Sequence, residues 1–293
     1  MNIVGRLKTK AEIKTLIDIG LNVFLLDIMD LTTKAIFPLN LFDLDFVIKA
    51  IKKQNKKVYL LINKMIHEND IKMLEKLFKK KLISEIDGIV INDLSVYVIA
   101  KEFDLEAKII YQPGTMNTNS YDAYYFENKI KGITLSKEIT YSEINLILNT
   151  NYNLEFSILA HGYLDMFYSK RKLITNYYKY KNIPINNIKN NHSFVLNEKT
   201  RKEALYPIIE DIHGTHIFRS KKLESFKEIK QLKTKLSDIF IERLFIDNQE
   251  YYDTIKAYLN EDFQNEFLNK YYDFDKGFYY LPTEKVKGDR NED

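Results

Sequence analysis

Short apolar segments alternate with longer segments of helical periodicity through the first 160 residues of the chain. Six segments rich in β-branched and aromatic residues are predicted to be strands: Val23 to Ile28, Lys57 to Asn63, Asp87 to Asp93, Lys108 to Pro113, Lys131 to Ser136 and Leu154 to Gly162. Between the first two predicted strands, Leu44, Val47 and Ile51 have the i, i+3, i+7 spacing of an amphipathic helix. Nearly continuous apolarity in the strands indicates a parallel sheet that is buried on both faces.

The number of these strand–helix units predicts a closed barrel rather than an open sheet. A seventh strand is predicted over Phe240 to Ile246, followed by a helix through Tyr258. We expect an α/β fold of the TIM-like (β/α) barrel class, with one domain over residues 1–282 and an insertion after the sixth strand. The insertion covers about residues 166–223 and includes two strand-like runs, SFVLN and THIFR. Residues 283–293 are nearly devoid of apolar side chains and are predicted to be a disordered tail.

Composition and charge narrow the class of protein. With 45% hydrophobic and 29% charged residues, the chain has the composition of an ordinary globular protein. The 44 Lys and Arg residues against 41 Asp and Glu give a net charge of +3, which argues against a protein that coats nucleic acid but allows a local basic patch. Since no uncharged apolar run of membrane-spanning length and no signal-peptide pattern occur, we expect a cytoplasmic protein without a membrane partner.

The complete absence of cysteine excludes several kinds of site. The chain cannot form disulfides, use a cysteine nucleophile, or hold zinc or an iron–sulfur cluster through its own thiolates. His213 and His216 lie three residues apart but lack a third ligand at metal-binding spacing, so no metal site is predicted. Ser157 and Ser169 lack the glycines of a nucleophile elbow, so the sequence does not support a serine hydrolase.

Polar residues that follow the predicted strands are the candidates for a ligand site, because functional groups of a parallel barrel lie at the carboxyl ends of its strands. The ligand-binding candidates are Asn63, His67, Asn92, Gln112, Thr115, Asn117, Asn119, Lys137 and Glu138. Amides suit a neutral polar ligand but do not activate a nucleophile, and each alone is also typical of a turn or helix cap. Four residues are expected to line one common cavity: Asn63, Gln112, Asn117 and His161.

The insertion has the most biased composition in the chain. Between Met166 and Asn197 there is no acidic residue, whereas lysine, arginine and tyrosine are frequent. Basic groups neutralise phosphates and aromatic rings stack on unpaired bases, so this segment favours single-stranded or loop RNA. A solvated basic surface is the alternative interpretation. The RNA-binding candidates are Lys170, Arg171, Lys172, Tyr177, Tyr178 and Lys179.

The segment LEFSILAHGYLDMFYSKRKLIT resembles the signature of the U32 family, the group long labelled collagenase-like peptidases. That signature runs His-Gly-Ala-Leu-Cys, then Ser-Tyr-Ser-Gly-Arg-Cys, then two aliphatic residues and Ser. The residues in register are His161, Gly162, Leu164, Tyr168, Ser169, Arg171, Leu173, Ile174 and Thr175. Weaker similarities occur in INKMIHENDI, DGIVINDL, QPGTMNTNS and DIHGTHIFRSKKL, so the resemblance covers about residues 20–260.

The chain departs from the signature at its cysteines. Asp165 and Lys172 stand where the first two cysteines belong, so the four-cysteine iron–sulfur site of RNA- and quinone-hydroxylating members cannot form. A protonated lysine ammonium cannot ligate iron. The chain is similar instead to shorter members with a degenerate signature. These occur beside a longer U32 protein and are associated with prephenate-dependent 5-hydroxylation of the tRNA wobble uridine.

The resemblance implies a barrel that takes part in tRNA modification as a substrate-binding or partner subunit without a cofactor of its own. Its implied partners are tRNA and a longer, cluster-bearing U32 paralogue, and its implied co-substrate is prephenate. In this hypothesis the catalytic candidates are His161 and Glu155, with His161 orienting a ligand or an internal carboxylate; a histidine buried in the core is the alternative. Two other functions stay open: a metal-independent peptidase, and a barrel enzyme that acts on a small metabolite without RNA.

Overall fold

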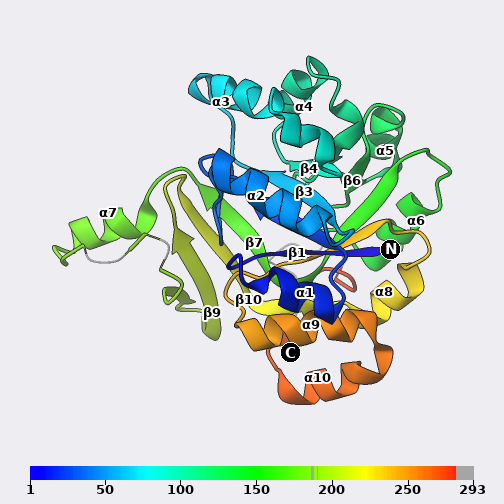
Figure 1. The fold of residues 1–293 in the computed structure, drawn as a ribbon. Coiled ribbons are helices and arrows are strands. Elements are labelled where there is room, and N and C mark those ends of the chain that lie inside the picture. Colours follow the sequence, from blue (N-terminus) through cyan, green and yellow to red (C-terminus); the bar gives the residue numbers. More distant parts are fainter. Residues whose placement is uncertain (186–187, 190, 282–293) are drawn as a thin grey trace.

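The computed structural model describes residues 1–185, 188–189 and 191–281, and its central feature is a closed barrel of parallel strands (Figure 1). In barrel order, the strands are β1 (Asn2–Arg6), β2 (Val23–Asp27), β3 (Lys57–Ile62), β4 (Gly88–Ile91), β5 (Ile109–Tyr111), β6 (Gly132–Thr134), β7 (Glu155–Ser169) and β11 (Asp238–Ile241). Strand β11 pairs in parallel with both β1 and β7, which closes the ring. The predicted TIM-like α/β barrel is therefore confirmed.

Strand β1 is the barrel strand that the hydrophobic pattern did not reveal. Its five residues, NIVGR, contain a glycine and end in an arginine, so the apolar run is too short to predict a strand. Gly5 allows the close approach of Tyr251 from α9 (Asn248–Leu259), because a Cβ at this position would collide with the tyrosine hydroxyl. Since β1 precedes the predicted strands, the sixth predicted strand is the seventh strand of the barrel, and the insertion follows it.

Helices follow the strands and cover the outside of the barrel (Figure 1). Besides α9 they are α1 (Glu12–Ile19), α2 (Leu41–Lys52), α3 (Glu68–Phe78), α4 (Leu94–Lys101), α5 (Ser120–Phe126), α6 (Tyr141–Leu148), α8 (Phe226–Leu232) and α10 (Gln264–Lys270). Short 3₁₀ turns span Lys81–Glu85, Glu106–Lys108 and Glu261–Phe263. The periodic apolar positions of α2 are all buried against the sheet, as predicted. A second, smaller apolar core fills the barrel interior around Tyr59 and Phe240.

Strand β7 leaves the barrel halfway along its length. Up to His161 it pairs in parallel with β11, and from His161 onward it pairs in the antiparallel direction with β10 (Thr215–Glu224). Gly162 has a φ of 106°, and a Cβ there would lie 2.7 Å from the carbonyl oxygen of Glu242. Only glycine combines this left-handed backbone with so close an approach. The glycine of the His-Gly pair therefore allows β7 to change partners.

The outer half of β7 carries an antiparallel extension. Strand β10 pairs with β9 (Arg201–Glu210), β9 pairs with β8 (Val195–Glu198), and the short β12 (Phe274–Asp275) pairs with β10. Residues 170–206 contain α7 (Leu173–Tyr180), β8 and the outer half of β9, and we call them the arm because they project from the barrel (Figure 1). The SFVLN and THIFR strands are thus confirmed, whereas β9 was not predicted.

Two sequence predictions concern features outside the barrel. The tail predicted over residues 283–293 lies outside the described residues. Within the described part of the chain, no helix combines the length and the apolarity needed to cross a membrane.

Candidate functional site at the mouth of the barrel

A cavity of about 140 Å³ lies at the carboxyl ends of the barrel strands. Its apolar wall includes Leu25, Leu61 and Phe240, which also belong to the core inside the barrel. Its polar and charged lining residues are Arg6, Lys34, Asn63, Asn92, Gln112, Lys137, Asp165 and Glu242. The cavity therefore lies where the strand-end rule predicts a ligand site, and its wall contains cations and carboxylates as well as amides.

Arg6, the last residue of β1, is buried beside this cavity in a network of charged groups. Its Nε and Nη2 donate to Oδ1 of Asp27 at 3.0 and 2.7 Å, and its Nη1 lies 3.3 Å from Oε1 of Glu242. Burial alone would lower the pKa of Arg6, but the carboxylates of Asp27 and Glu242 raise it above its usual value. Arg6 is thus a permanent cation at the mouth.

Glu242 presents one carboxylate oxygen that the described residues leave free. Its Oε1 accepts from Arg6 and from the backbone N–H groups of Arg243 and Leu244, at 2.9 and 3.1 Å. No described residue donates to its Oε2. A carboxylate oriented in this way can accept a hydrogen bond from a ligand or a water molecule in the cavity.

A second charged cluster joins the barrel to the extension. The Nζ of Lys34 lies 2.5 Å from Oδ2 of Asp165, and Nδ1 of His216 lies 3.2 Å from the same oxygen. The ring of His216 stacks on Tyr168 with centroids 4.7 Å apart. Burial would raise the pKa of Asp165, but Lys34, His216 and Lys137 together hold it well below its usual range. Asp165 is therefore a carboxylate whose charge is already compensated by the protein.

The cavity brings together several predicted ligand-binding residues. Asn63, Asn92, Gln112 and Lys137 all line it. Oδ1 of Asn63 accepts the backbone N–H of Thr33 at 2.8 Å, which leaves its amide NH₂ group for a ligand. The prediction that Asn63 and Gln112 share one cavity is confirmed.

The remaining ligand-binding candidates lie elsewhere. Asn117 is buried, with a φ of 65°, and donates to carbonyl groups of β5 and β6, so it holds the loop and does not line the cavity. Thr115 is exposed on the same loop, and the exposed Asn119 caps α5. His67 is exposed at the start of α3, and Glu138 lines a neighbouring cavity. The expectation that Asn117 faces the common cavity was wrong, because its amide group donates hydrogen bonds to backbone carbonyls instead.

His161 also faces away from the cavity. It is fully buried among the rings of Phe226, Tyr258, Phe267 and Phe274, with centroid distances of 5.4 to 6.2 Å. Within the described part of the chain, neither ring nitrogen has a hydrogen-bond partner. Burial and the nearby positive charge of Lys222 lower the pKa of His161 to about 3, so the ring is neutral near pH 7.

A β-bulge explains why this prediction was wrong. Leu159 of β7 faces the cavity and pairs with Phe240, but the next pair is His161 with Ile241, so Ala160 is an extra residue. The extra residue breaks the alternation of sides along β7, and His161 turns toward α8 and α9.

Glu155, the second catalytic candidate, is the first residue of β7 and therefore lies at the opposite, amino end of the barrel. It is partly exposed and forms an ion pair of 3.1 Å with Lys131. The two catalytic candidates do not converge, because five residues of extended strand lie between them.

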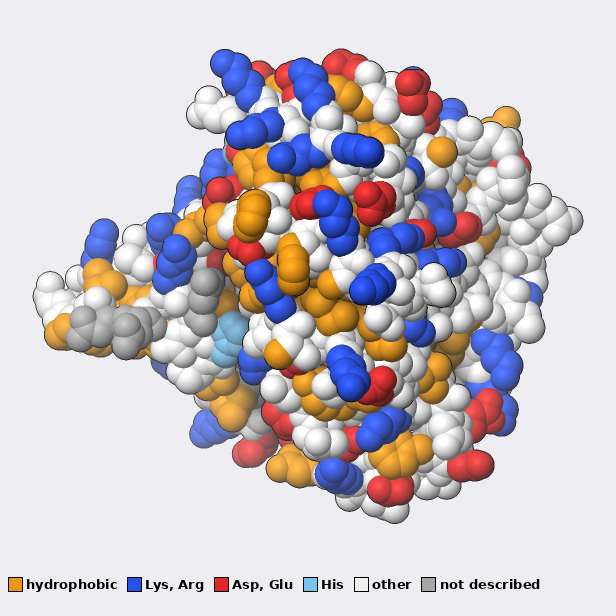
Figure 2. Space-filling view, in the orientation of Figure 1, with side chains coloured by type: hydrophobic (Ala, Val, Ile, Leu, Met, Phe, Trp, Pro, Cys, Tyr) orange, Lys and Arg blue, Asp and Glu red, His pale blue; other side chains and the backbone are white. Residues whose placement is uncertain are grey.

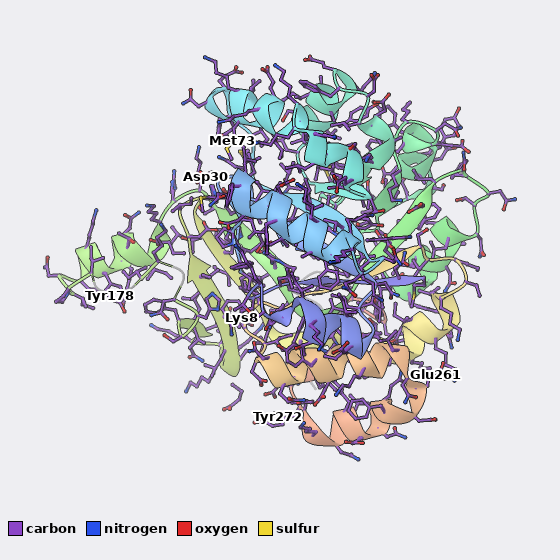
Figure 3. The ribbon with its side chains drawn as sticks, in the orientation of Figure 1. Lys8, Asp30, Met73, Tyr178, Glu261 and Tyr272 are labelled. Carbon is purple, nitrogen blue, oxygen red and sulfur yellow. The ribbon has the colours of Figure 1, made fainter. Side chains whose placement is uncertain are left out.

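The RNA-binding candidates lie on the arm. Lys170, Arg171 and Lys172 are exposed just before α7, as are Tyr177 and Lys179 within it. Figure 2 shows Lys and Arg side chains on this projecting part of the surface. Tyr178, labelled in Figure 3, packs instead on Phe194 in a small core of the arm, so its ring is poorly placed to stack on a base.

The sequence analysis missed five residues of this site: Arg6, Lys34, Asp165, His216 and Glu242. Arg6 and Glu242 are charged residues at strand ends, so the rule that selected the amides would have found them had β1 and the end of β11 been placed correctly. No local signal marks Lys34, which lies in a loop and meets Asp165 only in the folded chain.

The described residues do not fit the iron–sulfur cluster of cysteine-bearing U32 proteins. The whole chain has no cysteine, the carboxylate of Asp165 is engaged by Lys34 and His216, and Lys172 is an exposed ammonium. Within residues 1–185, 188–189 and 191–281, no three His, Asp or Glu side chains converge closely enough to hold a metal ion.

Comparisons with known proteins show the family to which this chain belongs. The sequence profile of Peptidase family U32 matches residues 32–275. The tRNA hydroxylation protein P2 of Bacillus subtilis is 28% identical over 225 residues, which cover 76% of this chain and 72% of that protein.

Two longer relatives are matched over less than half of their length. A protein of Methanocaldococcus jannaschii named as an uncharacterized protease is 29% identical over 172 residues, or 56% of this chain and 41% of that protein. The tRNA hydroxylation protein P of Escherichia coli is 22% identical over 220 residues, or 60% of this chain and 48% of that protein. Because the family profile extends over most of the barrel and the whole β7 signature, this chain belongs to peptidase family U32.

Proposed function

We propose that this protein takes part in tRNA hydroxylation as a substrate-binding or partner subunit without an iron–sulfur cluster of its own. The observation that carries the proposal is the similarity to tRNA hydroxylation protein P2, which extends over most of both chains. The reaction is the prephenate-dependent 5-hydroxylation of the wobble uridine. A longer, cluster-bearing U32 paralogue performs the oxidative step, since this chain has no thiolate to hold a cluster.

The charge of the arm supports an RNA partner. Residues 170–206 contain nine Lys and Arg residues and two Glu residues, so the arm carries a formal charge of +7, whereas the whole chain carries +3. The remainder of the chain is therefore net negative. A positive arm on a negative body directs a polyanion to the arm and away from the barrel wall.

The arm lies next to the barrel mouth, which supports a joint site for RNA and a small co-substrate. The Nζ of Lys170 lies 2.6 Å from Nε2 of His67, at the start of α3. An RNA loop on Lys170, Arg171 and Tyr177 can therefore extend an unpaired base toward the cavity. The cations Arg6, Lys34 and Lys137 around that cavity are suited to the carboxylates of prephenate.

The test is the nucleoside composition of tRNA from a strain that lacks this protein. We expect 5-hydroxyuridine and its derivatives to fall and to be restored by the parent gene. Gln112→Leu, which removes a cavity amide, should restore them poorly, whereas Lys235→Gln, an exposed change before β11 at the amino ends of the barrel strands, should restore them fully. Unchanged hydroxylated nucleosides in the deletion strain would contradict the proposal. Cleavage of denatured collagen by the purified protein would favour the peptidase alternative.

A further inference from the structure

A second cavity, of about 340 Å³, adjoins the barrel mouth and is not used by the proposed function. It lies between the loop after β6, the outer half of β7, and strands β9 and β10. Its charged and polar lining residues are Lys137, Glu138, Asp165, Arg201, Tyr206, Arg219 and Ser220. The two cavities share the wall formed by Lys137, Leu164 and Asp165.

A bulge in β10 exposes two of these residues to the cavity. Phe218 pairs with Asp165 and Lys222 pairs with Tyr163, so the three residues from Arg219 to Lys221 lie opposite one residue of β7. Such a bulge redirects side chains that regular pairing would place along the sheet. Here Arg219 and Ser220 line the second cavity.

The cavity wall has an excess of hydrogen-bond donors. Lys137 is partly buried and its ammonium contacts the backbone carbonyl of Asp165, but it forms no ion pair with any described residue. Arg219 is held by a 2.6 Å contact from Nη2 to Asp275 and lies over the ring of Phe278, so Nη1 stays unengaged by the described residues. Partly buried cations with unengaged donors are suited to charge-assisted hydrogen bonds with an anionic ligand.

The carboxylates on the wall offset these cations only in part. Oδ2 of Asp165 is engaged by Lys34 and His216, so the charge of Asp165 is shared between these groups and Lys137. Glu138 is the other wall carboxylate, and the same wall contains three cations: Lys137, Arg201 and Arg219. The hydroxyl of Ser220 adds a neutral donor.

We infer that this second cavity binds the phosphate or carboxylate group of a small molecule, with Lys137, Arg219 and Ser220 as its donors. An anion there receives charge-assisted hydrogen bonds from two elements, the loop after β6 and the bulge of β10. Its size and the rings of Tyr206 and Phe278 in its wall suit a small molecule rather than a polymer. Arg201 and Tyr206 of the arm line this cavity, but none of the RNA-binding candidates between Lys170 and Lys179 does, so anion binding here can be tested separately from RNA binding.

The test is direct binding of two probes, inorganic phosphate and malonate, measured by calorimetry with the full chain at constant ionic strength. Titration up to about 10 mM covers dissociation constants in the millimolar range. Saturable binding of one or both probes is expected, and the probe that binds more tightly identifies the anion. Arg219→Gln should weaken binding about tenfold or more, since a charge-assisted hydrogen bond is lost.

Two further variants keep the test informative if Arg219→Gln disturbs folding by freeing Asp275. Ser220→Asp removes no described contact and places a carboxylate in the cavity, so it should abolish binding of both probes. Arg171→Gln, an exposed change on the arm, should leave binding unchanged. Absence of saturable binding, or equal binding by the parent and Ser220→Asp, would overturn the inference. Displacement of either probe by a short single-stranded RNA in the parent but not in Arg171→Gln would assign the anion to RNA instead.

Discussion

The Nζ of Lys34 lies 2.5 Å from Oδ2 of Asp165, which joins the loop after β2 to the part of β7 that has left the barrel. Both side chains are only partly exposed, at 15% and 20%. In this ion pair, Asp165 occupies the position of the first cysteine in the family signature that the chain resembles. A position that holds a cluster ligand in other members thus links the barrel to the extension here.

Removing either partner of this pair should destabilise the protein. Lys34→Met or Asp165→Asn is expected to reduce the free energy of unfolding by about 1–3 kcal/mol, because each leaves a partly buried charge without its partner. The double variant should lose less than the sum of the two single losses. Urea denaturation of the four proteins measures this coupling, and strictly additive losses would show that the pair contributes no stability.

Gly162→Ala should be strongly destabilising. The alanine would have to adopt a left-handed φ with its Cβ 2.7 Å from the carbonyl oxygen of Glu242, so we expect a loss above about 3 kcal/mol. Gly114→Ala is the matched control, since Gly114 also has a positive φ but its Cβ would have 3.7 Å of clearance. Thermal unfolding should separate the two variants clearly. Equal losses would show that backbone strain alone, without the collision, determines the cost.

His161 should make the protein less stable in mild acid. The unfolded chain takes up a proton on this histidine near pH 6.5, whereas burial and Lys222 keep the folded pKa at about 3. The unfolded state therefore binds more protons between these values, and stability falls by up to about 1.4 kcal/mol per pH unit as the pH drops through this range. Above about pH 6.5 the contribution of His161 to pH dependence vanishes.

The measurement is the free energy of unfolding at several pH values for the parent and His161→Phe. The variant should have a shallower dependence on pH than the parent, because it lacks the group that the unfolded chain protonates. Ring signals of His161 in NMR spectra should stay those of a neutral imidazole at about pH 5. Protonation of His161 in the folded protein at that pH would contradict the expectation.

Changing Lys170, Arg171 and Lys172 together to glutamine should weaken RNA binding and reduce its salt dependence. Each phosphate contact that is lost should lower the slope of log affinity against log salt by about 0.7 for a single strand. Stability should change little because all three side chains are exposed. Fluorescence anisotropy with an anticodon stem-loop over a range of salt concentrations gives both quantities.

The control for this experiment changes three exposed lysines on the barrel wall, Lys14, Lys53 and Lys57, to glutamine. This variant has the same net charge as the arm variant. If both variants lose affinity equally, RNA responds to overall charge and the arm is an ordinary solvated surface.

The purified protein should carry no iron–sulfur cluster. Four thiolate ligands are absent from the chain, and the carboxylate at one signature position is already paired with Lys34. Protein purified without oxygen should lack sulfur-to-iron charge-transfer absorbance and stoichiometric iron. If such absorbance is found and persists after separation from every other polypeptide, the expectation is wrong.

The sequence alone was sufficient for the features that depend on local periodicity and residue chemistry. Apolar runs separated by amphipathic helices specify βα units. The carboxyl ends of the predicted strands are followed by Asn63, Asn92, Gln112 and Lys137, and these residues do line the cavity. The absence of cysteine is likewise a property of composition, and it needs no structure to exclude a thiolate-bound cluster.

Only the tertiary structure decided which charges meet and which way His161 faces. Lys34 and Asp165 are 131 positions apart, and Arg6 and Glu242 are 236 apart, so no window of sequence contains either pair. The direction of His161 depends on the bulge at Ala160, which forms because β7 must match β11 on one side and then turn at Gly162 to pair with β10. Side-chain direction in a strand follows from pairing with its neighbours, and those neighbours are chosen by long-range packing that local patterns do not encode.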